Sequence, residues 1–133
     1  MSAALKLGLR GEASTTVGEE NTAIAYGSGG ARVFATPAMI GLMENAALSS
    51  VDPLLEPGHI TVGIRVDVEH LAATPVGMKV TARSELLEID GKRLVFRVEA
   101  YDDKELIGRG THVRFIVNEQ HFLSRAAAKA KNE

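Results

Sequence analysis

The stretch from Thr36 to Val51 constrains the fold most strongly, because Glu44 is its only charged residue. Thr36 suits the N-cap of a helix, Pro37 suits the first helical position, and Pro53 forces a stop, which predicts a helix over Thr36–Ser50. A helix on a protein surface normally shows a whole charged face. We therefore expect this helix to be buried on most sides, wrapped by a sheet or held at a subunit interface.

Four strand-like runs follow the helix. They span His59–His70, Met78–Ile89, Lys92–Tyr101 and Glu105–Asn118. In the first run, valine and isoleucine occupy alternate positions from 62 to 68, which predicts that these four side chains share one buried face. Asp90-Gly91 between two runs is a strong hairpin signal. Strands grouped in this way, and not alternating with helices, predict an α+β fold with one antiparallel sheet built as a meander.

The remaining segments complete a single domain over residues 1–133. We expect a loosely held arm over residues 1–10, a first edge strand in Gly11–Glu20, a second short apolar segment at Ile24–Tyr26, a flexible loop at Gly27–Gly30, and a C-terminal helix and tail over 119–133. A single helix lying on one sheet leaves an edge or a face uncovered. Dimerisation is a simple way to cover it.

The composition excludes several classes of function. Fifteen Lys and Arg stand against 17 Asp and Glu, so the net charge of -2 gives no sign of a nucleic-acid or membrane partner. The absence of Cys excludes a thiol nucleophile, a disulfide framework and cysteine-ligated zinc. The histidines lack the spacing of metal ligands, so we expect no metal and no cofactor. Without an apolar N-terminal run, the expected location is the cytoplasm.

Glu44 is the first candidate for chemistry. Burying an ionised carboxylate without a partner costs several kcal/mol in practice, so the fold must supply a partner for it. Groups in that situation cluster at functional sites. The alternative is that Glu44 emerges at a gap in the packing and meets solvent or a structural Lys.

His70 and Thr36 are the next candidates. His70 continues the alternating apolar series and ends its strand, where a neutral imidazole can remove a proton or orient a nucleophile. Thr36 stands at the start of the helix, beside free backbone N–H groups that favour developing negative charge. Each residue also has a purely structural alternative: a histidine bonded to a backbone carbonyl, and a threonine that only caps the helix.

The spacing of these candidates raises a geometric problem. Thr36 and Glu44 are eight residues apart, which is about 12 Å along a helix axis. Two side chains at that separation do not reach the same carbon atom. Either the chain bends away near Thr36, or the two groups come from different subunits, and we predict a site at a dimer interface.

Two other features are weaker signals. The Gly27–Gly30 loop has no Gly-Lys-Ser/Thr after it, so it is not a phosphate-binding P-loop. Arg114 lies in the last strand, where it is suited to a carboxylate or a phosphate. An arginine in such a strand is more often simply an exposed residue.

Four stretches carry a family resemblance. They are VFATPAMIGLME at 33–44, HLAATPVG at 70–77, DGKRL at 90–94 and IGRGTH at 107–112. Together they resemble fluoroacetyl-CoA thioesterases and their hot-dog relatives, over most of the chain from about Val33 to Ile116. The resemblance implies a hot-dog fold, in which an antiparallel sheet wraps around a long central helix, and a homodimer with sites at its interface.

The resemblance also implies roles for individual residues. Thr36, Glu44 and His70 correspond to the family's catalytic threonine, glutamate and histidine. Gly63 falls where the family places a glycine at the thioester and CoA, and Arg114 falls at a substrate-binding arginine. The expected reaction is hydrolysis of an acyl-CoA to the free acid and CoA. Attack by Thr36, activation of water by Glu44 and direct attack by Glu44 all remain open.

This chain departs from the family pattern shortly before the threonine. The fluoroacetyl-specific enzyme carries a phenylalanine lid there, whereas this chain has Gly30 in a flexible loop. The departure predicts a substrate other than fluoroacetyl-CoA, with a short-chain or aryl acyl group. Two alternative functions are a non-catalytic acyl-CoA sensor or carrier and, ranked lower, an enoyl-CoA hydratase.

Overall fold

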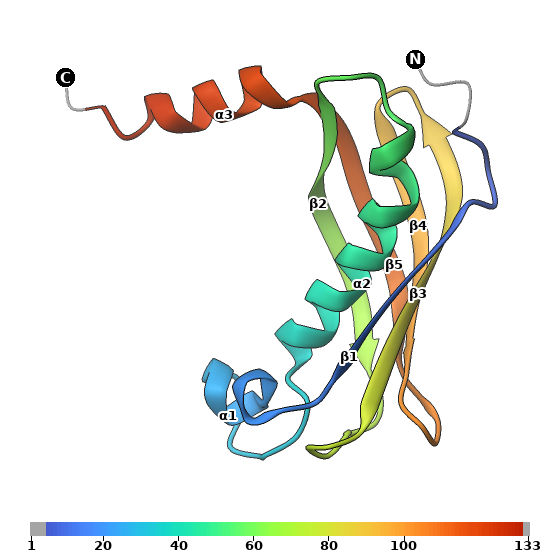
Figure 1. Ribbon diagram of the computed structural model, residues 1–133, viewed down its shortest axis with the longest axis vertical. Coiled ribbons are helices and arrows are strands. Elements are labelled where there is room, and N and C mark those ends of the chain that lie inside the picture. The colour runs from blue at the N-terminus through green and yellow to red at the C-terminus, as the bar shows by residue number, and fades with distance from the viewer. Residues whose placement is uncertain (1–4, 132–133) are drawn as a thin grey trace.

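The computed structural model describes residues 5–131 and contains one sheet and one long helix (Figure 1). The strands are β1 (Arg10–Thr16), β2 (His59–His70), β3 (Lys79–Asp90), β4 (Arg93–Tyr101) and β5 (Leu106–Asn118). The helices are α1 (Ala23–Tyr26), α2 (Thr36–Val51) and α3 (Glu119–Ala128), with two 3-10 turns, η1 (Glu19–Asn21) and η2 (Asp52–Leu54). The predicted α+β class and the predicted long helix are confirmed. The short apolar segment at Ile24–Tyr26 lies in α1.

The five strands are all antiparallel, in the order β1-β3-β4-β5-β2. A meander therefore describes only β3, β4 and β5. The expectation that β2 continues it is wrong, because β2 crosses over and pairs with β5 at the far end of the sheet. Both β1 and β2 are edge strands, and each has one side without a hydrogen-bonded neighbour among residues 5–131.

Helix α2 lies against the concave face of the sheet, as the ribbon drawing shows (Figure 1). Its buried face consists of Met39, Met43, Ala46, Ala47 and Val51. On the opposing strands the alternate side chains of β4, from Leu94 to Ala100, are all fully buried. Gly11 permits the close approach of α2 to β1, since a Cβ atom at this position would overlap the Ala46 carbonyl oxygen. Small residues thus let the sheet wrap closely around the helix.

The alternation expected along β2 is interrupted by a bulge. The pairing with β5 shifts between Gly63 and Arg65, so that one extra residue, Ile64, stands in β2. Gly63 faces α2 before the bulge, and His70 faces α2 after it. The prediction that residues 62 to 68 keep one face throughout is therefore wrong. Without the bulge, a period of two would put Gly63 and His70 on opposite faces.

The two ends of the chain differ. Residues 5–9, expected to belong to a loose arm, are tied to β3, because Gly8 N–H donates to the Leu86 carbonyl and Leu86 N–H donates to the Leu9 carbonyl. Residues 1–4 of that arm lie outside the described part of the chain. The predicted C-terminal helix is present as α3, which projects away from the body of the protein (Figure 1). Within residues 5–131, no helix is long and apolar enough to cross a membrane.

Candidate active site

Thr36 is the first residue of α2 and does not cap the helix, contrary to the N-cap prediction. Ala35 takes the N-cap position with extended backbone angles, and among the described residues no side chain caps this end of the helix. Pro37 follows in the first turn, where its missing N–H costs nothing. The Thr36 hydroxyl, which is exposed, is therefore free of the structural task that would explain a threonine here.

The Thr36 hydroxyl is hydrogen-bonded to His70 instead. Its Oγ1 lies 2.7 Å from the His70 Nδ1. Burial lowers the pKa of His70, because it disfavours the charged imidazolium, while the backbone at Ala72 acts in the opposite direction. The ring is thus held neutral, and a neutral Nδ1 that accepts the hydroxyl proton fits the arrangement of a base and its nucleophile.

The other ring nitrogen of His70 is more constrained. Nε2 is buried and makes no hydrogen bond of normal geometry to any residue between 5 and 131. The Ala72 backbone nevertheless lies near enough to favour the protonated ring. The imidazole is therefore held by the Thr36 hydroxyl at one nitrogen and lies close to the Ala72 backbone.

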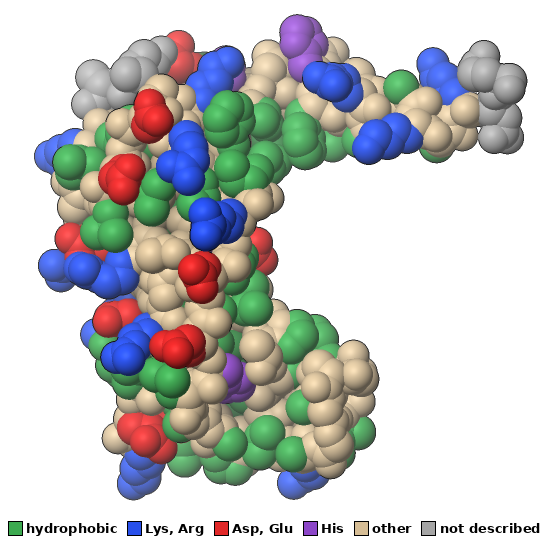
Figure 2. Space-filling model, turned by 180° about the vertical axis from the view of Figure 1, so that it is seen from behind, with side chains coloured by type: hydrophobic (Ala, Val, Ile, Leu, Met, Phe, Trp, Pro, Cys, Tyr) green, Lys and Arg blue, Asp and Glu red, His purple; other side chains and the backbone are tan. Residues whose placement is uncertain are grey.

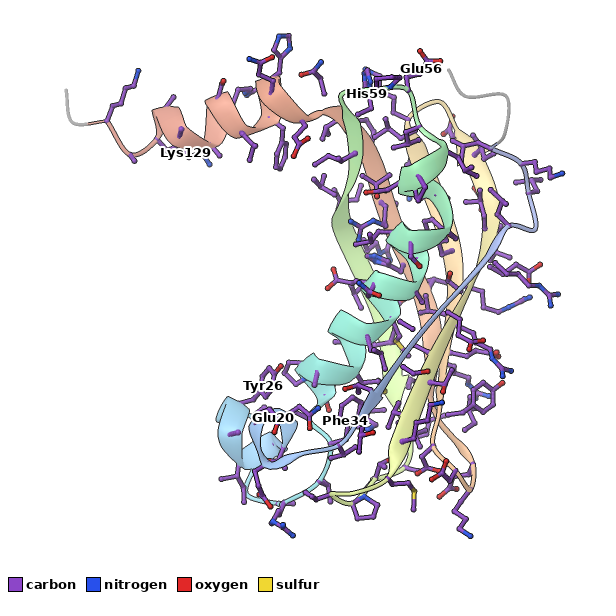
Figure 3. The ribbon with its side chains drawn as sticks, in the orientation of Figure 1. Glu20, Tyr26, Phe34, Glu56, His59 and Lys129 are labelled. Carbon is purple, nitrogen blue, oxygen red and sulfur yellow. The ribbon has the colours of Figure 1, made fainter. Side chains whose placement is uncertain are left out.

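A pocket of about 290 Å³ opens at this pair. Besides Thr36 and His70 it is lined by small or apolar residues: Ala23, Ser28, Val33, Phe34, Leu71, Ala72 and Ala73. Residue Phe34 is labelled beside the start of α2 in the stick view, with α1 next to it (Figure 3). The lining contains neither Lys nor Arg. It suits an uncharged acyl group better than a phosphate.

Glu44 lies two turns further along α2 and belongs to a different neighbourhood. It is half-buried and points toward β2, where a Cβ atom built on Gly63 would be 2.8 Å from Glu44 Oε2. The lack of a side chain at Gly63 leaves room for the carboxylate. Glu44 also lies near enough to His112 and Arg114 to favour their charged forms. It makes no hydrogen bond or ion pair of its own with the described part of the chain.

Arg114 is the centre of a buried polar network and not the exposed strand residue that its sequence context suggested. Only 5% of it is exposed. Its Nε donates to Thr61 Oγ1 at 2.7 Å, its Nη2 donates to the Thr61 carbonyl at 2.9 Å, and its Nη1 donates to His112 Nε2 at 3.1 Å. The Thr61 hydroxyl donates in turn to Asp52 Oδ1 at 2.5 Å. The network ties β5 to β2 and to the C-terminal end of α2.

His112 completes this network at the bulge. Because Nε2 accepts from Arg114, the ring proton must sit on Nδ1, which donates to the Arg65 carbonyl at 2.8 Å. Burial is the main cause that lowers the pKa of His112, and the Arg114 charge adds to it. In the sequence, His112 lies in a stretch that carries the family resemblance and lacks the spacing of a metal ligand, and neither observation predicts a role for this residue. The one available signal was its position two residues before Arg114, on the same face of the same strand.

The five sequence-predicted site residues thus form two groups in one chain. Thr36 and His70 meet at the start of α2, while Glu44, Gly63 and Arg114 meet at the bulge. Since Thr36 and Glu44 occupy one continuous helix, the separation of about 12 Å along its axis stands. Within residues 5–131, no cluster of three or more metal-ligating side chains occurs.

Comparison with known proteins assigns this architecture to a family. Residues 17–120 match the family described as fluoroacetyl-CoA-specific thioesterase. A fluoroacetyl-CoA thioesterase from Streptantibioticus cattleyicolor is 43% identical over 97 residues, which cover 73% of this chain and 70% of that protein. Residues 17–120 contain the whole of α2 and the strands β2, β3, β4 and β5.

Solved structures give the same result. A fluoroacetyl-CoA thioesterase superposes with a TM-score of 0.90 at 35% identity, covering 96% of this chain and 99% of its own. A thioesterase superfamily member from Thermus thermophilus superposes at 0.85 with 29% identity and 96% of both chains covered. A hot-dog-like protein from Thermanaerovibrio acidaminovorans, at 22% identity, shares the fold with a TM-score of 0.86. The fold is the hot-dog fold, as the resemblance implied.

Proposed function

The chain belongs to the fluoroacetyl-CoA-specific thioesterase family, and from this premise we propose that it hydrolyses an acyl-CoA to the free acid and CoA with the side chains of Thr36, His70 and Glu44. Family membership supplies the reaction class, a thioester hydrolase. The observation that carries the assignment of residues is the 2.7 Å hydrogen bond between Thr36 Oγ1 and His70 Nδ1.

This hydrogen bond favours Thr36 as the nucleophile. Neutral His70 takes the hydroxyl proton while Thr36 Oγ1 attacks the thioester carbonyl, and backbone N–H groups at the start of α2 stabilise the oxyanion. The carbon–sulfur bond then breaks, and the CoA thiolate leaves with the proton from His70. Glu44 next removes a proton from water, whose oxygen attacks the acyl-threonine. The bond between the acyl carbon and Thr36 Oγ1 then breaks, Thr36 Oγ1 takes that proton back, and the acid is released. A positioned base contributes about 10²–10⁴ in rate.

A homodimer supplies the second half of the site in this proposal. The outer side of β2 is an open strand edge, and Ile64 and Val66 on it are 54% and 39% exposed. Open apolar edges are normally covered, and two copies of one edge strand pair antiparallel about a twofold axis. The partner-facing side of the molecule is hollowed, as the space-filling view shows (Figure 2).

The register of that pairing solves the distance problem. When the twofold axis passes through Asp67, with Ile64 as the extra residue of the bulge in each strand, Gly63 of one protomer stands opposite the partner's His70. The Glu44 carboxylate lies where a side chain at Gly63 would be, and it is therefore beside the Thr36–His70 pair of the partner. Each dimer has two such sites, and neither is complete within one chain.

Arg114 acts in this proposal by positioning the bulge. Its contacts with Thr61 and His112 face inward, so it holds Gly63 and Glu44 in place and acts on the substrate through them. We therefore propose a positioning role for Arg114, in place of the direct contact with substrate that the family resemblance implies. In this proposal the reaction uses no cofactor and no metal, and CoA is part of the substrate. The proposed location of the protein is the cytoplasm.

The acyl group is proposed to be bulkier than fluoroacetyl. Solved variants of the fluoroacetyl-CoA thioesterase replace a phenylalanine and, six positions later, a threonine. In this chain the position six residues before Thr36 is Gly30, and a Cβ atom there would meet no other atom within 4 Å. The open loop leaves room beside the small and apolar pocket lining for a short branched chain or an aryl ring.

Release of free thiol from a panel of acyl-CoA substrates tests the proposed function. The panel spans fluoroacetyl-, acetyl-, isobutyryl- and benzoyl-CoA, with Glu44→Gln and His70→Ala as variants. We expect turnover of the bulkier substrates and its loss in both variants. Binding without turnover would instead indicate an acyl-CoA sensor, and unchanged turnover in both variants would exclude these residues.

Rapid-quench mass spectrometry tests the nucleophile. The proposal expects an acyl adduct on Thr36 of the wild-type protein within the first turnover, lengthened in lifetime by Glu44→Gln. Thr36→Ala, with Thr22→Ala as the matched control outside the pair, must lose the adduct. An adduct that survives Thr36→Ala would assign the covalent step to Glu44.

A further inference from the structure

Helix α3 has almost no contact with its own chain. None of its residues is buried, and two large apolar side chains, Phe122 and Leu123, are 41% and 55% exposed. An isolated helix of 10 residues is marginal in water, because its nucleation is costly and few hydrogen bonds repay it. A helix of this length normally persists because an apolar face packs on something else.

The position of α3 indicates that its apolar face packs on a second copy of the chain. It continues directly from β5, and at its start Glu119 N–H donates to the Gly58 carbonyl just before β2. From there it projects beyond the open edge of β2, over the hollow side of the molecule (Figures 1 and 2). The volume beneath it is the one that a second copy paired through β2 would fill.

Antiparallel pairing determines which part of the partner lies there. The His59 end of one β2 strand lies beside the His70 end of the other. Helix α3 leaves the His59 end, so it reaches the partner's α1 and the exposed residues Ile24, Tyr26 and Leu71, which are 54%, 51% and 48% exposed. In one chain Tyr26 and Lys129 stand at opposite ends of the same hollow side (Figure 3). The twofold axis brings these two ends together.

Helix α3 and its C-cap carry positive charges, which the lining of the pocket at Thr36 and His70 does not have. Coenzyme A carries phosphate groups, yet the pocket at Thr36 and His70 has no cationic residue in its lining. Arg125 of α3 and Lys129, the C-cap that directly follows the helix, are four residues apart and share one face, with Phe122 on the same side. Arginine and lysine are the residues that bind phosphate groups.

We infer that α3 of each protomer docks on α1 of its partner and forms the outer wall of the partner's acyl-CoA site. Phe122 and Leu123 cover the apolar residues of α1, and Arg125 and Lys129 contact the phosphates of CoA. This inference rests on the proposed dimeric thioesterase. It adds a CoA-binding element that comes from the second subunit.

A comparison of two substrates tests the phosphate contact. The double variant R125A/K129A is assayed with an acyl-CoA and with the same acyl group on pantetheine, which lacks the nucleotide phosphates. We expect KM for the acyl-CoA to rise about tenfold, which is 1.4 kcal/mol of binding, with kcat and the pantetheine kinetics unchanged. The matched control R83A/R97A removes two arginines from the outer face of the sheet and should change neither. An equal effect on both substrates, or none, overturns the inference.

Mixed dimers test the exchange between subunits. One protomer carries His70→Ala with an intact α3, and the other carries R125A/K129A with an intact His70. The single working pocket then receives the intact α3 from its partner, so KM for acyl-CoA should equal the wild-type value. A raised KM would mean that α3 serves its own chain, which contradicts the inference.

A third measurement separates failure of the inference from failure of the proposed function. F122S/L123S should shift the protein toward monomer in analytical ultracentrifugation and lower acyl-CoA turnover. If wild-type protein hydrolyses no acyl-CoA of the panel, the proposed function fails. If wild-type protein is active and dimeric while both α3 variants, R125A/K129A and F122S/L123S, match it, the inference alone fails.

Discussion

The Thr36–His70 pair and the network around Arg114 are both polar, yet the fold holds them in opposite ways. The pair depends on one side-chain hydrogen bond at the mouth of a pocket, and within residues 5–131 the second ring nitrogen of His70 makes no hydrogen bond of normal geometry. The network has partners for every group that it buries, from Asp52 through Thr61 to His112. The difference indicates that the pair is built for reaction and the network for rigidity. Substitutions in the two regions should therefore separate activity from stability.

His70→Ala should have the largest effect on rate and little effect on folding. Removing a positioned base lowers kcat by about 10²–10⁴, whereas the loss of one partly exposed hydrogen bond costs about 1 kcal/mol of unfolding free energy. Steady-state kinetics and urea denaturation measure the two quantities. His59→Ala, at the other end of β2, is the matched control and should retain full activity. A large loss of stability in His70→Ala would remove the distinction between the regions.

Arg114→Met should show the reverse pattern. It leaves the Thr61 hydroxyl and carbonyl and His112 Nε2 without their buried donor, which costs about 3 kcal/mol of unfolding free energy. The control is Arg109→Met on the same strand, where an exposed ion pair with Glu69 contributes less than about 1 kcal/mol. Urea denaturation of both variants measures the difference. Equal stability of the two variants would contradict a structural role for the network.

Gly63→Ala should fall between these cases. The new Cβ atom would lie 2.8 Å from Glu44 Oε2 and 3.2 Å from His112 Cε1, so the carboxylate must move. We expect kcat to fall about tenfold, by misplacement of Glu44, with a stability loss of about 1 kcal/mol. Gly30→Ala, where no atom lies within 4 Å, is the control and should retain wild-type kcat. Unchanged kcat in Gly63→Ala would separate Glu44 from the reaction.

The smallest effect is expected from pH, and it tests both regions at once. The pKa of His70 is lowered by burial, so kcat/KM should hold constant down to about pH 6.5, the ordinary histidine pKa, and fall only below it as the base becomes protonated. The pKa of His112 is lowered for the same reason. The neutral form of His112 therefore contributes to the free energy of unfolding. This contribution is fully present above the pKa of histidine in the unfolded state, and it is lost as the pH falls through the lower pKa of the folded state. Rates and urea midpoints between pH 5 and 8 measure both. An acid limb above pH 6.5 would contradict a neutral His70.

The elements of the fold were readable from the sequence, and their arrangement was not. The helix over Thr36–Ser50 and the strand over His59–His70 follow from local patterns of charge and alternation, and the structure has them within one residue. The pairing of β2 with β5 is a long-range contact that no local pattern encodes. The bulge at Ile64 was also hidden, because Val66 and Val68 continue the apparent alternation across it.

Some residues of the candidate site were also predicted from the sequence, and others were not. Thr36 and His70 were expected to act together, and their hydrogen bond confirms that they meet. The structural alternative for Thr36, a capping hydroxyl, failed because Ala35 takes the N-cap position. Thr61 and Asp52 were missed because ordinary polar residues carry no signal until the strands that hold them are paired.

Complementation between two inactive variants tests the central claim, that Thr36 and His70 of one protomer work with Glu44 of the other. His70→Ala and Glu44→Gln homodimers are each expected to be inactive. In a mixed dimer one site regains all three wild-type residues and the other loses two. The account therefore predicts that purified heterodimers recover about half of the wild-type acyl-CoA hydrolysis, one working site of two. Heterodimers as inactive as the parent variants would contradict it, because that result would require all three residues to act within a single chain.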